Sequence, residues 1–193
     1  AIAFIGLTIS LKDPGFAIAN DEGYYLSYAE VVHQNGLSGF RDSFDLYVSD
    51  SRHWIYPNPL RVGYFAVAAL WIKIFGVSLV PLAYLSAVCH IGFILAVGIF
   101  SYRWFGRARC LMITALIATS PLCLALARRA LADSMATFML ALTTGLFIER
   151  IRNPASRAVT IAFPIVFALT ILVKEHTAFF LVPVLFYTVY DWL

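Results

Sequence analysis

The stretch VSLVPLAYLSAVCHIGFILAVGIFSY, residues 77–102, contains no Asp, Glu, Lys or Arg. A helix of about 20 apolar residues crosses the roughly 30 Å hydrocarbon core of a bilayer, so this stretch is long enough to span a membrane. The whole chain has the same character, because 61% of its 193 residues are hydrophobic and its mean hydropathy is +0.81. Only 13% are charged, against about 25% in a soluble domain. We therefore predict an integral, multi-pass membrane protein.

Further apolar stretches lie on both sides of this one. The opening run AIAFIGLTIS is interpreted as the surviving end of a first membrane helix, and a polar loop follows it at about 11–57. The fold class we predict is all-α, a polytopic transmembrane helical bundle. Residues 1–193 would form one module, incomplete because its first and last helices are truncated, and residues 11–76 would form an extracytoplasmic loop with juxtamembrane helices. The remaining apolar stretches are 58–76, 110–127, 135–148, 158–173 and a last one from 177.

Two connectors rich in arginine indicate the topology. RWFGRAR, residues 103–109, and ERIRNPASR, residues 149–157, each carry three arginines. The positive-inside rule assigns both to the cytoplasm. Two passes would separate them, which predicts that residues 128–134 and residues 174–176 lie on the outer side.

The position of the polar loop follows from counting passes. If the loop is outside and Arg103 is inside, an odd number of passes lies between them, yet two apolar stretches are available. Arg61, Trp71 and Lys73 interrupt the first of these, residues 58–76. We interpret it as an interfacial helix on the outer leaflet. The alternative is a tilted spanning helix, which would put the acidic loop inside.

Composition also limits the kinds of partner. The net charge is +3 and no basic stripe is present, so we predict no binding of nucleic acid. The three cysteines lie inside apolar segments and the four histidines lack ligand spacing, so the sequence supports no metal site. No cofactor is predicted, although a divalent metal is left open.

The stretch NDEGYYLSYAEVV, residues 20–32, places two acids directly after the first apolar run. Asn20 is a suitable N-cap, and Asp21 and Glu22 then fall in the first helical turn, where the helix dipole favours negative charge. Gly36 would stop this helix. The acids would then only cap a helix. Carboxylates near hydrocarbon also tend to be functional, and desolvation raises their pKa as a general base requires. Both interpretations stay open. One face of this helix would carry Asp21, Tyr25, Tyr28, Ala29 and Val32.

Three further groups carry charge or polar side chains at the predicted outer side. Arg128 and Arg129 contradict the positive-inside rule there, so their positive charge requires a negative partner. A bound phosphate is one candidate. An ion pair of Arg129 with Asp133, four residues further on, is the other. Lys174 either belongs to a polar turn or reaches a lipid phosphate. The stretch YPNPLR would make a stiff turn before a helix whose first turn contains Leu60 and Arg61. The side chains expected to line a site facing the loop are Tyr25, Tyr56, Asn58 and Arg61.

In order and topology, these motifs resemble the membrane glycosyltransferases of the GT-C fold, in particular protein O-mannosyltransferases and aminoarabinose transferases (glycosyltransferase families 39 and 83). The matching stretches are Asp21-Glu22, YPNPL, RRALAD and LVKE. The chain departs from these families at YPNPL, where they often have His-Pro-Pro or Lys-Pro-Pro. Arg61 or Arg52 would then replace the missing basic residue.

The resemblance implies transfer of a sugar from a polyprenyl-phosphate donor to a lipid, glycan or protein acceptor, with inversion. Asp21 would be the general base and Glu22 would support it. Arg128 or Arg129, with Lys174, would bind the lipid phosphate, and Asp133 would orient them or touch the sugar. The site would lie on the outer side of a plasma (inner) membrane, among membrane lipids as further partners. A multi-pass transporter or lipid flippase is the alternative, and a non-catalytic membrane partner is a third.

Overall fold

The computed structural model describes residues 20–192, and every regular element in that range is helical. The prediction of an all-α membrane bundle is confirmed, whereas the run at residues 1–10 lies outside the described range. The elements are α2 (Asn20–Asn35), α3 (Ser38–Ser49), η1 (Ser51–Ile55), α4 (Val62–Phe75), α5 (Leu79–Thr119), α6 (Pro121–Ala127), α7 (Asp133–Arg152), α8 (Arg157–Val173), η2 (Glu175–Phe180) and α9 (Leu181–Trp192).

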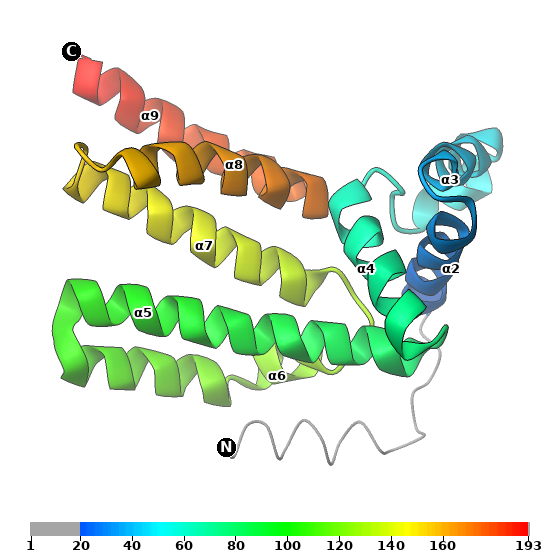
Figure 1. The fold of residues 1–193 in the computed structure, drawn as a ribbon, viewed down its shortest axis with the longest axis horizontal. Coiled ribbons are helices and arrows are strands. Elements are labelled where there is room, and N and C mark those ends of the chain that lie inside the picture. The colour runs from blue at the N-terminus through cyan, green and yellow to red at the C-terminus, as the bar shows by residue number, and fades with distance from the viewer. Residues whose placement is uncertain (1–19, 193) are drawn as a thin grey trace.

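Helix α5 is a hairpin of two antiparallel arms. Gly106, inside RWFGRAR, has φ 77° and ψ 178°, a conformation that glycine adopts without steric penalty. The chain reverses there, so residues 79–105 and 107–119 run side by side in opposite directions (Figure 1). The predicted stretch 110–127 is not one helix, because it breaks at Ser120. Pro121 cannot donate a backbone hydrogen bond, and the Ser120 side chain caps the new helix α6.

The apolar helices α5, α7 and α8 pack side by side as a layer (Figure 1). Within residues 20–192, α5 and α7 are long and apolar enough to cross a membrane, while α4 and α8 are shorter apolar helices. Helix α7 packs between α5 and α8 (Figure 1). The Thr143 and Thr170 hydroxyls join α7 to α8 by a hydrogen bond of 2.8 Å. On the other side, Phe100 of α5 lies where a side chain on Gly145 of α7 would stand, so only glycine permits this contact.

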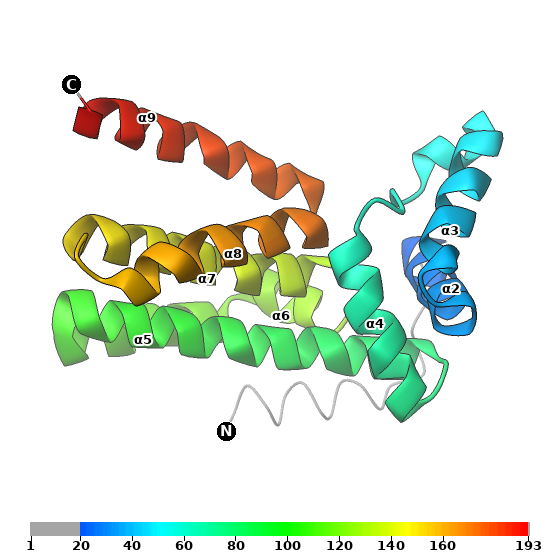
Figure 2. The same ribbon diagram turned by 45° about the horizontal axis from the view of Figure 1, so that its top comes forward.

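The two ends of this layer differ. Helices α2, α3 and α4 lie across one end, and α5 begins at that same end (Figures 1 and 2). Both connectors rich in arginine, at the α5 reversal and between α7 and α8, lie at the opposite end (Figure 1). We call the first the loop end and the second the arginine end.

An aromatic core joins α2 to α4 at the loop end. From α2 it takes Tyr25, Tyr28, Ala29 and Val32, all buried. Tyr25 meets Tyr64 of α4 edge to face, with ring centroids 5.2 Å apart. Helix α2 ends before Gly36, which has φ 62°, as the sequence predicted.

Two features near this core differ from the prediction. Helix α3 was not expected, and it packs on α2 through Gly39, whose missing side chain leaves room for the backbone of residues 31–32. Helix α4 begins at Val62 rather than at Leu60, because Asn58 Oδ1 accepts the Leu60 N–H at 2.9 Å and holds a turn there.

Candidate active site

The Glu22 side chain links helix α2 to the segment between α6 and α7 by hydrogen bonds. Its side chain is 1% exposed. The carboxylate accepts hydrogen bonds from Arg129 Nε (3.2 Å), Arg129 Nη2 (3.3 Å) and the backbone N–H of Ala130 (2.9 Å). A buried carboxylate with three donors is a fixed structural link between segments that are 107 residues apart.

Asp21, the neighbouring acid, is exposed. The Arg129 hydrogen bond to Glu22 is the main cause that raises the Arg129 pKa, and the negative charge of Asp21 adds to it. Burial raises the Tyr25 pKa to about 12, with smaller contributions that include the charges of Asp133 and Asp21. Asp21 therefore lies within electrostatic reach of Arg129 and Tyr25, with its carboxylate open to an incoming molecule.

Arg61, which precedes α4, is the centre of a second cluster. Its Nε and Nη2 atoms each donate to a different Glu175 oxygen at 3.0 Å, so the pair is bidentate. Its Nη1 donates to the Tyr25 hydroxyl, and its guanidinium carbon lies 5.7 Å from the centre of the Tyr25 ring. The Arg61 side chain is only 11% exposed. Sequence reasoning did not name Glu175 as a site residue, because its partner is 114 positions away.

Lys174 and Asp133 form a third pair, with Lys174 Nζ 2.7 Å from Asp133 Oδ1. The predicted ion pair of Arg129 with Asp133 is wrong. Helix α7 begins at Asp133 and residues 128–132 form the turn before it, so the four-residue spacing of a helix face does not apply. Each of the two residues is paired instead with a side chain from a distant element.

The remaining predicted residues occupy different surroundings. Tyr56 stacks on Tyr24 with ring centroids 3.9 Å apart. Asn58 holds the turn before α4. Arg52 donates to Asp50 at 2.8 Å and its side chain is 87% exposed, so Arg61 is the basic residue that joins the cluster. Arg128 is exposed at the end of α6.

One buried hydroxyl lies beneath these pairs. Tyr64 is 1% exposed and its hydroxyl has no hydrogen-bond partner among the described residues. Burial raises its pKa, and the charges of Tyr25, Asp133 and Glu22 add to this effect. A neutral phenol in the α2–α4 core was not expected as part of the site, because an apolar helix face gives no signal for it.

Asp21 and the three ion pairs together provide an open carboxylate and several cations at the loop end of the bundle. Asp21 is exposed, whereas Arg129 is paired with Glu22 and Lys174 is paired with Asp133. Residues 20–192 contain no group of three or more His, Cys, Asp or Glu side chains that could hold a metal ion. The chemistry available to these side chains is proton transfer and binding of an anion.

A comparison with protein families agrees with this class of chemistry. The fold and the family together define a membrane glycosyltransferase of the GT-C class. The family model described as dolichyl-phosphate-mannose-protein mannosyltransferase matches residues 61–193, more than half of the chain, so the chain belongs to that family. The match includes Arg61, Asp133 and Lys174 but not α2 with Asp21 and Glu22. No curated protein and no solved structure matches the chain.

Proposed function

We propose that the chain transfers a sugar from a polyprenyl-phosphate donor to an acceptor hydroxyl at the extracytoplasmic face, with inversion. The observation that carries the proposal is that the charge of Asp21 acts on Arg129, and that Asp21 and Asp133, the partner of Lys174, both act on Tyr25. The positive-inside rule assigns the arginine end to the cytoplasm. A lipid-linked donor has its phosphate at the bilayer surface, where these cations lie.

In this mechanism Asp21 is the general base. Its carboxylate takes the proton of the acceptor hydroxyl, the acceptor oxygen bonds to the anomeric carbon, and the bond from that carbon to the phosphate oxygen breaks. Attack from the face opposite the leaving group inverts the anomeric centre. Glu22 does not take part in proton transfer, because its oxygens are occupied by Arg129 and Ala130. It fixes the position of Asp21 beside the cations.

The leaving phosphate gathers negative charge as the bond breaks. Lys174, together with Arg128 or Arg129, stabilises that charge. Because Lys174 contacts Asp133 at 2.7 Å, the phosphate takes the place of Asp133 as its partner. Asp133 is then available to a sugar hydroxyl, and Tyr25, Tyr56, Asn58 and Arg61 line the same side. The family description names mannose and protein, so mannose and a protein hydroxyl are the first donor sugar and acceptor to test.

The experiment measures transfer of radiolabelled mannose in membranes that contain the full-length protein. We expect transfer from polyprenyl-phosphate mannose and none from a nucleotide-linked mannose. Lys174→Met should raise the donor KM by about 10- to 100-fold, in line with loss of one charge-assisted contact of about 1.5–3 kcal/mol. Lys73→Met, which removes an exposed lysine from α4, is the matched control with a wild-type KM. Transfer from the nucleotide donor alone, or an unchanged KM in Lys174→Met, contradicts the proposal.

A further inference from the structure

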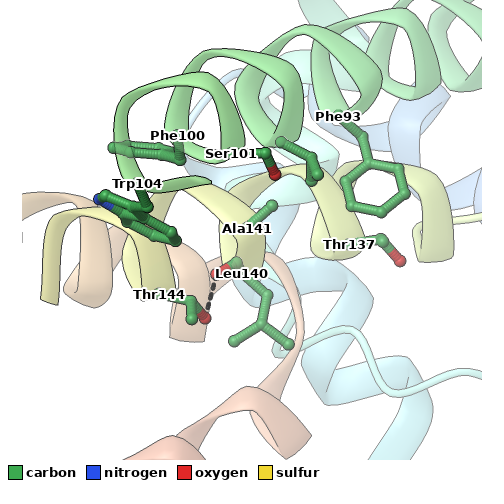
Figure 3. Close-up of a pocket in the computed structure, with 10 residues that line it drawn as sticks. Phe93, Phe100, Ser101, Trp104, Thr137, Leu140, Ala141 and Thr144 are labelled. Carbon is green, nitrogen blue, oxygen red and sulfur yellow. Dashed lines mark hydrogen bonds between the residues drawn. The ribbon is translucent and has the colours of Figure 1, made fainter. Parts of the chain in front are cut away.

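An apolar groove lies between α5 and α7, and it extends from Thr137, one helical turn after Asp133, to Trp104. Its volume is about 290 Å³. Figure 3 shows the rings of Phe93, Phe100 and Trp104 on the α5 side, and Leu140, Ala141 and Thr144 on the α7 side. The Thr144 hydroxyl donates to the Leu140 carbonyl at 2.8 Å. Its hydrogen bond is therefore made within α7, and an apolar molecule in the groove would not leave this donor without a partner.

The groove has fixed walls. The Phe100 ring lies against the backbone at Gly145, where no side chain is present to displace it. Phe100 and Trp104 stack with ring centroids 5.3 Å apart. The Trp104 indole N–H donates to Glu149 Oε1 at 2.9 Å. A stacked and hydrogen-bonded wall is preorganised, which lowers the entropic cost of binding.

A cation lies at the Trp104 end of the groove. Arg103 Nη2 is 3.3 Å from Glu149 Oε2, so Arg103 and the Trp104 wall share one carboxylate. Glu149 is buried, whereas the Arg103 side chain is 57% exposed. The connectors at this end, residues 103–109 and 149–157, contain six arginines and Glu149 as their one acid. The groove therefore opens beside a large excess of positive charge.

We propose that this groove binds an anionic phospholipid of the cytoplasmic leaflet, with an acyl chain between α5 and α7 and the headgroup phosphate at Arg103. Charge complementarity selects this occupant. A purely apolar helix would fill the groove but add no negative charge beside the arginines, and a zwitterionic lipid would bring no net negative charge. Basic pockets between transmembrane helices on the cytoplasmic side are suited to anionic headgroups. The site is independent of the proposed sugar transfer.

The test is native mass spectrometry of the full-length protein in detergent, titrated with phosphatidylglycerol or phosphatidylcholine of identical acyl chains. We expect the wild type to retain phosphatidylglycerol at least tenfold more tightly. Ala141→Trp, which fills the groove, should lower that affinity at least tenfold. Ala168→Trp places the same side chain on an exposed position of α8 outside the groove, and it should bind as the wild type does.

A second pair of variants tests the headgroup contact. Arg103→Gln should reduce the preference for phosphatidylglycerol about fivefold, since one arginine near an anionic headgroup is worth about 1 kcal/mol. Arg41→Gln, at the loop end on α3, should not change it. Thermal unfolding of each variant, followed by circular dichroism, shows whether it is folded. Equal affinity of the wild type for the two lipids overturns the proposal, as does unchanged binding in folded Ala141→Trp. Displacement of phosphatidylglycerol by an equimolar amount of polyprenyl phosphate would overturn the assignment to a phospholipid.

Discussion

The loop end and the arginine end of the bundle differ in how their positive charges are balanced by acids. At the loop end, cations pair with acids from distant parts of the chain: Arg61 with Glu175, Arg129 with Glu22, and Lys174 with Asp133. At the arginine end, six arginines accompany one buried acid, Glu149.

The difference separates two uses of a cation in a membrane protein. A pair between distant segments fixes how those segments lie, and it keeps each charge satisfied until a charged substrate replaces one partner. An excess of arginine over acids is instead the pattern that the positive-inside rule associates with the cytoplasmic side, and it is suited to anionic headgroups. The loop end is thus suited to a reaction site and the arginine end to a lipid contact.

The largest expected effect is on thiol labelling from outside the cell, which should be complete at one end of the bundle and absent at the other. In a cysteine-free background of the full-length protein, in which Cys89, Cys110 and Cys123 are replaced by alanine, Ser51→Cys and Ala155→Cys place single thiols at exposed positions of the two ends. A membrane-impermeant maleimide added to intact cells should label Ser51→Cys at once, and Ala155→Cys only after permeabilisation. Labelling of both thiols in intact cells would remove the distinction between the ends.

The next effect is on folding. Glu22→Ala removes a buried carboxylate and leaves the Ala130 N–H and the Arg129 guanidinium without their partner. We expect a loss of about 3 kcal/mol in the free energy of unfolding. Glu30→Ala, which removes a less buried acid from the same helix, should change it by less than about 0.5 kcal/mol. Denaturant unfolding in detergent measures both, and equal losses would mean that Glu22 is not a specific link.

The smallest effect is a dependence on pH. Burial raises the Glu175 pKa, but the hydrogen bonds and charge of Arg61 outweigh it, so the Glu175 pKa is below its ordinary value of 4.5. A lowered folded-state pKa gives stability that is present above 4.5 and is lost as the pH falls through the folded value. From roughly pH 6 to about pH 3.5, the melting temperature of Glu175→Gln should therefore fall less than that of the wild type. Because Glu175 is partly exposed, the difference should be small, and identical slopes would contradict it.

Local patterns in the sequence predicted much of the fold. The charge-free run of residues 77–102 predicted the first arm of α5, and Gly36 predicted the end of α2. Both signals depend on residues next to one another in the chain. The break at Ser120-Pro121 is also a local signal, but the apolar character on both sides concealed it.

The site was harder to predict, because its contacts join distant segments. Helical spacing in the sequence predicted a pair of Arg129 with Asp133. In the structure Arg129 pairs with Glu22, and Asp133 pairs with Lys174. The Glu22-to-Arg129 and Arg61-to-Glu175 contacts cross 107 and 114 positions. No periodicity within one segment encodes such a pair. The distinct surroundings of Asp21 and Glu22, one open and one buried, likewise depend on what α2 packs against.

The most direct test of the account compares transfer and stability in Asp21→Asn. We predict that its mannose transfer from polyprenyl-phosphate mannose falls by about 10²- to 10⁴-fold, the range for loss of a general base, while its melting temperature stays that of the wild type. Asp45→Asn, which changes an exposed acid on α3, should keep both properties. Wild-type transfer by folded Asp21→Asn would contradict the account and leave α2 as a helix without a catalytic acid.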